Sequence, residues 1–274
     1  MDSVSIVRDS SLSGTDIIGD LRLQWSARCD VGRVRETNED AALALPGIYL
    51  LADGMGGHES GELASEAALL TLAGVFGSGV LGSGAAGSGN LLAARTELDT
   101  LLDVAQARID EIDAHSDRPA GTTATGAVLV TADNQPHWLI LNIGDSRTYR
   151  YQNGTLNQLT RDHSQVQEFV DAGVITPEEA RIDPRRNVIT RALGAGMIEP
   201  VADYFTTVAL PGDVLLICSD GLTGELPDEE IAGILASAHD SRDAADALVN
   251  AALALGAHDN VTVIVITVTD VRGC

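Results

Sequence analysis

The sequence predicts an α+β fold in which antiparallel β-sheets are faced by helices. Strand-like apolar runs come in groups along the chain, whereas apolar residues at helical spacing are confined to separate blocks. The pair Asn153-Gly154 stands between two strand-like runs and is a strong hairpin signal, which also favours antiparallel pairing. No internal repeat is visible, and a chain of 274 residues is compatible with one large domain.

The chain begins with a polar stretch. Residues 1–20 show no sustained period, so we expect a mobile N-terminal tail followed by a folded domain that spans 21–270. From Leu21 the run LRLQWSARCD alternates like a strand, and IYLLAD, which ends at Asp53, has the pattern of a short buried strand.

Helices and a loop are expected next. Apolar residues at spacings of three and four predict two amphipathic helices, ELASEAALLTLAGVF and LLAARTELDTLLDVAQARIDEI. The Gly/Ser-rich stretch between them, 77–90, is predicted to be a flexible surface loop.

The second half of the chain is rich in predicted strands. They are TTATGAVLVT, HWLILNIG, RTYRYQ and TLNQLT, and later YFTTVAL, GDVLLICSD and VTVIVITVTD. A polar segment with two prolines, 161–187, separates the two groups and indicates a surface subdomain. A helical stretch is predicted from about Asp228 to Leu255.

Composition excludes several classes of partner and location. The chain has 40 acidic and 17 basic residues, and the net charge of -23 disfavours nucleic acid and anionic membranes as primary targets. Three cysteines, Cys29, Cys218 and Cys274, are too few and too widely spaced for a zinc site or a disulfide framework. No run approaches 18 apolar residues and the start lacks signal-peptide character, so a cytoplasmic protein is expected.

Four aspartates stand at the ends of predicted strands. Asp53, Asp145 and Asp220 each follow an apolar run, and Asp259 directly precedes one. An aspartate at a turn often only caps local N–H groups. Four such residues on the rim of rigid sheets can instead converge, and converging carboxylates need a cation between them. Oxygen ligands without His or Cys favour Mg²⁺ or Mn²⁺.

Two neighbouring features extend this hypothesis. The glycines after Asp53 would let a backbone carbonyl, most simply that of Gly54, approach an ion. Arg35 precedes the pair Glu39-Asp40, and a guanidinium can bind phosphate oxygens in a planar fork or form a salt bridge with an acid. Both roles of Arg35 stay open on these grounds alone.

Eight short motifs then carry a resemblance to a known family. In chain order they are RETNED (35–40), DGMGGHESGE (53–62), GTTATGAVL (121–129), GDSRTY (144–149), TRDHS (160–164), TRALG (190–194), SDGL (219–222) and DNVT (259–262). Together they resemble the bacterial branch of the PP2C (PPM) family of metal-dependent protein serine/threonine phosphatases, over about Leu21 to Val268. The resemblance implies a four-layer α-β-β-α sandwich of two antiparallel sheets, with a flap at 161–192.

The resemblance also implies residue roles. Asp53, the Gly54 carbonyl, Asp220 and Asp259 would hold two Mn²⁺ or Mg²⁺ ions, and Asp145 with Asp220 would hold a third, weaker ion. Arg35 would bind the substrate phosphate, while Glu39 and Asp40 would orient water. The implied reaction is hydrolysis of phosphoserine or phosphothreonine monoesters by a water or hydroxide that bridges the two metals.

The sequence departs from the family pattern at two places. Animal members carry a proposed general-acid histidine directly after the Asp-Gly pair, but Met55 stands there and His58 follows three residues later. Bacterial flaps often carry His-Pro before the Arg-Arg-Asn stretch, whereas this chain has Asp183-Pro184, and Asn187 is a further candidate contact to the third ion.

The resemblance implies phosphorylated proteins as partners, among them a cognate bacterial Ser/Thr kinase, for a monomeric enzyme. A pseudophosphatase that only binds phosphoproteins is the main alternative, but it would be expected to lack Asp53, Asp220 or Asp259. A calcium-binding protein is disfavoured because the acids are dispersed and no D-x-D-x-D-G loop exists.

Overall fold

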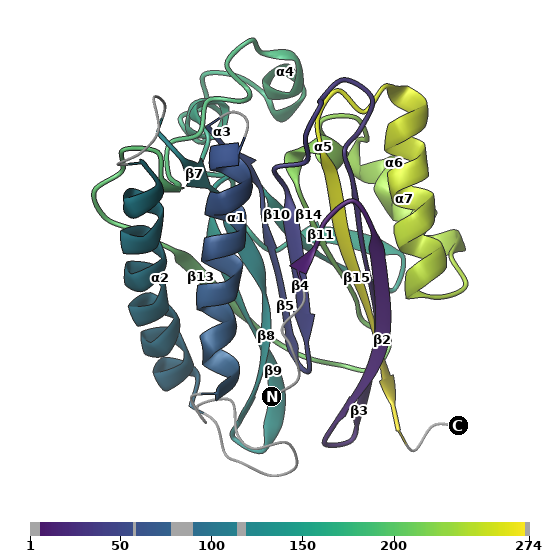
Figure 1. The fold of residues 1–274 in the computed structure, drawn as a ribbon. Helices are drawn as coiled ribbons and strands as arrows, with labels where there is room; N and C mark the ends of the chain where they lie inside the picture. Colours follow the sequence, from purple (N-terminus) through teal and green to yellow (C-terminus); the bar gives the residue numbers. More distant parts are fainter. Residues whose placement is uncertain (1–5, 57–58, 78–89, 114–118, 272–274) are drawn as a thin grey trace.

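Two antiparallel sheets packed face to face form the centre of the molecule (Figure 1). The structure, a computed structural model, describes residues 6–56, 59–77, 90–113 and 119–271. The first six-stranded sheet has the order β1-β4-β5-β8-β9-β13, and the second has the order β11-β10-β14-β15-β3-β2. A small third sheet, β12-β7-β6, lies at one end.

The strands have the following bounds. The first sheet contains β1 (Ile6–Val7), β4 (Ala41–Leu45), β5 (Ile48–Ala52), β8 (Ala124–Ala132), β9 (Gln135–Ile143) and β13 (Asp203–Val208). The second contains β2 (Ser11–Ile18), β3 (Leu21–Asp30), β10 (Arg147–Gln152), β11 (Thr155–Gln158), β14 (Val214–Cys218) and β15 (Val261–Asp270). The third contains β6 (Gly54–Met55), β7 (Gly121–Thr122) and β12 (Leu193–Gly194).

Helices cover the outer faces of both large sheets. The first sheet is covered by α1 (Glu59–Leu72), which continues into a 3₁₀ turn (Ala73–Gly77), and by α2 (Leu91–Asp113). The second is covered by α6 (Asp228–Ser237) and α7 (Ser241–Leu255), with the short α5 (Asp220–Thr223) at one end. The predicted four-layer α+β sandwich is therefore confirmed.

Three aliphatic cores lie between the four layers. Strand β5 is buried at every position, and its neighbours Leu50 and Leu51 point to opposite faces of the first sheet. Leu50 packs in the core under α1 and α2, whereas Leu51 packs between the sheets with Trp138. Leu248 of α7 belongs to the third core, on the outer face of the second sheet. Double-sided burial explains why β5 shows a continuous apolar run instead of alternation.

Within the expected mobile tail at 1–20, the structure forms two strands that the sequence analysis did not predict, at residues 6–7 and 11–18. Ile6–Val7 pairs with β4, and all eight residues of Ser11–Ile18 pair with β3. Strand β2 is an edge strand whose side chains are mostly exposed or half-exposed, so its sequence carries no hydrophobic period. Backbone pairing holds it in place, and Gly14 leaves room for an indole ring, since a Cβ there would lie 2.5 Å from Cζ2 of Trp25.

Most other predicted elements occur where the sequence places them. The Asn153-Gly154 turn joins β10 and β11, with positive φ values of 50° and 80° at the two residues. The helical stretch from Asp228 is broken at Ala238, where α6 ends, and α7 begins at Ser241. Strand β4 was not predicted, and most of the expected loop at 77–90 lies outside the described residues.

The flap carries two short helices, α3 (Gln165–Asp171) and α4 (Pro177–Ile182), which lie above the sandwich in Figure 1. The strand β7 and the helix α5 lie at this same end of the sheets. Among the helices of the described ranges, none is long and apolar enough to cross a membrane.

Candidate metal centre

The four aspartates at strand ends lie at the flap end of the sandwich. Asp53 follows β5, Asp145 follows β9, Asp220 begins α5 just after β14, and Asp259 lies two positions before β15. Burial raises the pKa of Asp53 well above its usual range, and the negative charges of the other three and of Asp40 raise it further. These four aspartates and Asp40 are therefore neighbours, and we call the five residues the acid set.

These carboxylates oppose one another's ionisation. Burial raises the pKa of Asp40 to about 7, partly countered by the nearby Ser219 and Thr262 hydroxyls, and the charge of Asp220 raises it further. Burial also raises the pKa of Asp220 to about 6, with the charge of Asp259 as the next cause. A divalent cation among the acids would remove this repulsion.

Buried carboxylate oxygens with few hydrogen-bond partners favour such an ion. The Oδ1 atom of Asp145 is buried and accepts no hydrogen bond from the described residues, and both side-chain oxygens of Asp40 are buried with only the Ser219 and Thr262 hydroxyls near them. An unsatisfied buried oxygen is costly unless it has a partner such as a metal ion. Among the described residues, no group of three or more Asp, Glu, His or Cys side chains is already arranged to hold a metal ion.

Backbone and hydroxyl groups fix Asp53 in position. Its carbonyl accepts hydrogen bonds from Thr123 N (2.9 Å) and Thr122 Oγ1 (3.0 Å), and its own N–H donates to Thr123 Oγ1 (3.0 Å). The threonines precede β8 and are fully buried. The carboxylate of Asp53 thus projects from a rigid base.

Gly54 is also required by close packing of the backbone around it. A Cβ at this position would lie 2.3 Å from the carbonyl oxygen of Gly61 in α1 and 2.6 Å from that of Glu39. Close packing of three backbone segments therefore demands glycine, whether or not an ion approaches.

Arg35 forms the salt bridge that the sequence left open beside phosphate binding. Its Nη2 atom lies 2.7 Å from Oδ2 of Asp259, and the exposed fractions of the two side chains are 48% and 31%. The guanidinium therefore stands at the accessible rim of the acid set. In this position it can exchange one carboxylate partner for an incoming anion.

Glu39 and Asp40 lie deeper and are held by a residue whose role sequence reasoning missed. Asn260 accepts a hydrogen bond from Glu39 N (2.9 Å) and donates to the carbonyls of Val31 (2.9 Å) and Thr37 (3.0 Å). It thereby ties the loop that carries Arg35, Glu39 and Asp40 to the start of β15. The sequence does contain a signal for this role. Asn260 stands between Asp259 and a buried strand, and a buried amide needs several hydrogen-bond partners.

The Asp220 turn is packed against the same Asn260 segment. Ser219 N donates to Thr262 O, and Thr262 N donates to Ser219 Oγ, both at 3.0 Å. A Cβ on Gly221 would lie only 1.9 Å from the Asn260 carbonyl oxygen, so this approach also requires glycine. Cys218, just before this turn, is fully buried and burial raises its thiol pKa, in agreement with a packing role.

A second residue missed by sequence reasoning, His163, links the flap to the turn before Asp145. Its Nδ1 atom accepts a hydrogen bond from Gly144 N at 3.1 Å, and its Nε2 atom lies 3.1 Å from Oδ2 of Asp203. Arg191 donates to the other oxygen of Asp203 at 3.0 Å. Burial lowers the pKa of His163, which favours a neutral ring that accepts at Nδ1 and donates from Nε2.

Two further candidates, His58 and Asn187, receive no support from contacts. His58 lies outside the described residues. Asn187 is exposed in the turn after α4, and among the described residues no hydrogen bond joins it to Asp145. Asp183, four positions earlier in the flap, accepts hydrogen bonds from Arg185.

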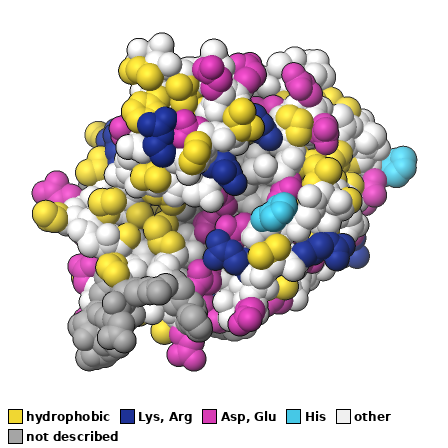
Figure 2. Space-filling view, turned by 90° about the horizontal axis from the view of Figure 1, so that it is seen from above, with side chains coloured by type: hydrophobic (Ala, Val, Ile, Leu, Met, Phe, Trp, Pro, Cys, Tyr) yellow, Lys and Arg dark blue, Asp and Glu magenta, His cyan; other side chains and the backbone are white. Residues whose placement is uncertain are grey.

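Charge is arranged around the acid set. Figure 2 looks onto the flap end of the molecule, where acidic side chains line the central hollow and basic side chains surround it. An anionic substrate group would meet these basic side chains on its way to the acids.

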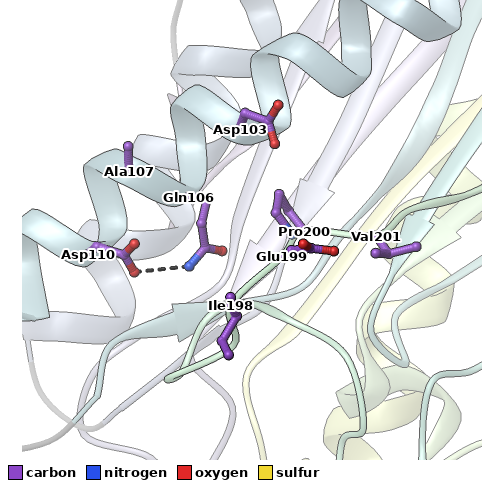
Figure 3. Close-up of a pocket in the computed structure, with 8 residues that line it drawn as sticks. All are labelled: Asp103, Gln106, Ala107, Asp110, Ile198, Glu199, Pro200 and Val201. Atoms are coloured by element: carbon purple, nitrogen blue, oxygen red, sulfur yellow. Dashed lines mark hydrogen bonds between the residues drawn. The ribbon is translucent and has the colours of Figure 1, made fainter.

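A separate pocket contains none of the predicted site residues. It has a volume of about 410 Å³ and lies between α2 and the segment 198–201 (Figure 3). Gln106 at its wall donates to Asp110 (2.9 Å) and to Met197 O (3.2 Å), and it accepts from Gly194 N (2.8 Å). These bonds anchor Gly194 and Met197, which follow the flap, to α2, and this is a structural role.

Comparisons with known proteins agree with this geometry. The family model "Protein phosphatase 2C" matches residues 33–255. The chain is 37% identical over 247 residues to the serine/threonine phosphatase stp of Listeria monocytogenes, covering 87% of this chain and 93% of that protein. It is also 38% identical over 251 residues to the serine/threonine protein phosphatase PstP of Mycobacterium tuberculosis, covering 91% of this chain and 46% of PstP.

A solved structure is similar over nearly the same span. The catalytic domain of PstP in complex with two manganese ions superposes with a TM-score of 0.76 at 35% identity, covering 91% of this chain and all of that domain.

Proposed function

Because the chain belongs to the protein phosphatase 2C family, we propose that the acids at its strand ends form the catalytic metal centre of a protein serine/threonine phosphatase. The observation that carries this assignment is the convergence of five aspartates, of which Asp40 and Asp145 are buried, so that the charges of the other four all raise the pKa of Asp53. The manganese ions in the similar PstP catalytic domain support the same ligand chemistry.

Each residue has a role that follows from its position. We assign Asp53, Asp220, Asp259 and the Gly54 carbonyl to two Mn²⁺ or Mg²⁺ ions. When bound, two such ions supply a water of lowered pKa and neutralise phosphate charge. Asp145 lies next to the charge of Asp220 and has a free buried oxygen, so we assign this pair to a third, weaker ion.

The remaining residues act on substrate and water. Arg35 stands at the rim, where it can leave Asp259 and bind two phosphate oxygens. Glu39 and Asp40 are almost fully buried on a loop tied to Asn260, so they can orient a water and accept its proton. No protein nucleophile is required, in keeping with the buried Cys218.

The experiment that tests this proposal is a metal titration of purified protein stripped with EDTA. We expect hydrolysis of a phosphothreonine peptide to be absent after chelation and to return with Mn²⁺ or Mg²⁺. Calorimetry without substrate should show two ions that bind more tightly than a third. A third ion that is lost selectively in Asp145→Asn would support its placement.

A matched control uses an aspartate outside the acid set. Asp103→Asn changes a carboxylate of α2 in the pocket of Figure 3 and should leave metal activation unchanged. Full turnover by protein that contains no detectable metal would refute the metal centre.

We further propose phosphorylated proteins as substrates, including a Ser/Thr kinase that this enzyme opposes, and a cytoplasmic monomer as the working form. The names of the relatives support the substrate class. Cys29 and Cys218 are free thiols, which supports a reducing compartment. Sedimentation would test the monomer, and dephosphorylation of an autophosphorylated kinase domain would test the substrate.

A further inference from the structure

The segment Ile6–Ser10 lies directly behind the loop that carries Glu39 and Asp40. Arg8 of this segment donates from Nη1 to the Asn38 carbonyl at 3.2 Å and from Nη2 to the Glu62 carbonyl of α1 at 3.1 Å. Its Nη1 atom also lies 3.1 Å from the Glu62 carboxylate. Arg8 therefore clamps two segments together, the acid-bearing loop and the first turn of α1.

A relay extends this clamp to Glu39. Arg8 Nη2 donates to Ser65 Oγ at 3.1 Å, and Ser65 Oγ in turn donates to the Glu39 carbonyl at 2.7 Å. Glu39 N is held on the other side by Asn260. Both backbone groups of Glu39 are thus fixed by residues from distant parts of the chain.

Asp9 holds Asn38, the residue that precedes Glu39. Its Oδ1 atom accepts a hydrogen bond from Asn38 Nδ2 at 2.8 Å, while Asn38 Oδ1 accepts from Asp40 N at 3.1 Å. Asp9 has a φ of 48°, a left-handed conformation that is unfavourable for most residues and acceptable for aspartate or asparagine. The conformation directs Asp9 at Asn38, whose amide group then holds the buried Asp40.

We propose that Arg8 and Asp9 are positioning residues of the metal centre, which set the placement of Glu39 and Asp40 through Asn38 and Ser65. The inference rests on the metal centre assigned above and adds to it a segment that precedes the span 33–255 matched by the family model. Residues that orient the groups around a metal site commonly change metal affinity or activity by about 10–100-fold when they are replaced.

The test compares Arg8→Met and Arg8→Lys with a control arginine. Arg28 in β3 is equally suited because its side chain is 20% exposed, against 13% for Arg8, and it bonds to Asp246 and Asn250 of α7. Neither of these α7 residues belongs to the acid set. Arg28→Met should therefore lower stability without changing the metal site.

We expect Arg8→Met to raise the Mn²⁺ concentration for half-maximal activity about tenfold and to lower kcat by a similar factor. KM for the phosphopeptide should change less than about threefold, since Arg8 does not touch the substrate. Arg8→Lys keeps the charge and one or two of the bonds, so it should lie between Arg8→Met and the parent.

A second pair of variants tests Asp9 without strain. Asp9→Asn keeps both the left-handed preference and an acceptor for Asn38, so its metal response should match that of the parent. Asp9→Gly keeps the backbone conformation but loses the contact, and should weaken the Mn²⁺ response about fivefold to tenfold. This pair decides the question if Arg8→Met fails to fold.

Mn²⁺ calorimetry without substrate separates this inference from the function itself. If the parent binds no Mn²⁺, the assigned metal centre fails, and this inference fails with it. If the parent binds Mn²⁺ and Arg8→Met and Asp9→Gly bind it equally well, only the positioning role is refuted. Loss of thermal stability in Arg8→Met with unchanged Mn²⁺ binding, as expected for Arg28→Met, would also assign Arg8 a purely structural role.

Discussion

The N-terminal segment 6–18 and the flap 161–192 both border the acid set, but they are attached to it in different ways. The N-terminal segment joins both large sheets through the backbone pairs of β1 and β2. The flap contains short helices whose ends are closed mainly by their own residues. Thr176 and Glu179 form a capping box at α4, and Ser164 caps α3.

The two regions therefore differ in what a perturbation would change. A displacement of the N-terminal segment reaches Asn38, Glu39 and Asp40 through Arg8 and Asp9. A displacement of the flap reaches the body mainly through Asp162, which is paired with Arg147 of β10, and through His163 and Arg191. Both regions have a polar sequence, and they differ in the kind of attachment: backbone strand pairs hold the N-terminal segment, whereas mainly side-chain contacts hold the flap.

The largest effect is expected at the acid set that both regions border. Asp53→Asn preserves side-chain shape but removes the charge next to four other aspartates. We expect kcat for a phosphothreonine peptide to fall by roughly 10³-fold or more, as for central members of catalytic units. Steady-state kinetics with Asp103→Asn as the control will measure it, and a loss below tenfold would remove the centre on which the comparison depends.

Arg35 should show a different kinetic signature from Arg8. Its ion pair with Asp259 lies at the rim, and its loss should weaken binding of the substrate phosphate by about 1.5–3 kcal/mol. We therefore expect Arg35→Ala to raise KM for phosphopeptide about tenfold or more, with a smaller change in kcat. If Arg35→Ala and Arg8→Met both changed mainly KM, or both mainly kcat, phosphate binding by Arg35 and positioning of the metal centre by Arg8 would not be distinct roles.

The pH dependence of the metal-free protein tests the charge of the acid set. The folded-state pKa values of Asp40 (about 7) and Asp220 (about 6) lie above the ordinary value of 3.8. Between pH 4 and 7 the folded state therefore retains protons that the unfolded state has lost, so stability falls as pH rises. We expect the melting temperature in EDTA to fall by roughly 5 °C or more from pH 5 to pH 8.

Two additions sharpen this measurement. Asp40→Asn should reduce the fall, because the variant has no carboxyl to ionise at that site. Saturating Mn²⁺ should also reduce it, since the cation favours the ionised carboxylates. A melting temperature in EDTA that rises over this interval would contradict the buried, mutually repelling arrangement.

The smallest expected effects are changes in melting temperature caused by one substitution in each of the two regions. Gly14→Ala places a methyl group against Trp25 in the N-terminal segment, and such overpacking costs about 1–3 kcal/mol. The melting temperature should fall by roughly 3–6 °C. Thr176→Ala removes the capping box of α4 at a local cost of about 1 kcal/mol, but the global melting temperature should move by less than about 1 °C.

Hydrogen exchange would separate these outcomes. Amides of α4 should exchange faster in Thr176→Ala, while those of β2 and β3 keep the parent rates. Equal shifts of the melting temperature in both variants would show that the flap and the N-terminal segment unfold together.

Much of the fold could be predicted because strands and helices have different periods. The runs that became β3, β8, β15 and α2 carry these patterns clearly. The convergence of Asp53, Asp145, Asp220 and Asp259 was also predictable, because a rigid buried strand fixes the backbone of an aspartate at its end and so restricts where the carboxylate can lie.

The remainder depends on contacts between residues far apart in the sequence. Asn260 bonds to a residue 221 positions away, and Arg8 bonds to residues 30 and 54 positions away. Strand β2 was not predicted because this edge strand is held by backbone hydrogen bonds, which do not depend on the side chains and leave no pattern in the sequence. The sequence predicts Gly54 as a carbonyl ligand, and the backbone crowding that also requires glycine there appears only in three dimensions.

The place of β15 has a consequence for the timing of activity in the cell. This strand is synthesised after every other described strand, yet it occupies an inner position between β14 and β3. Asp259 and Asn260 directly precede it, so a nascent chain that still has β15 inside the ribosome can neither close the second sheet nor complete the acid set. Such late, non-local pairing is slow, and only chains that have emerged through β15 can begin to remove phosphate from other proteins.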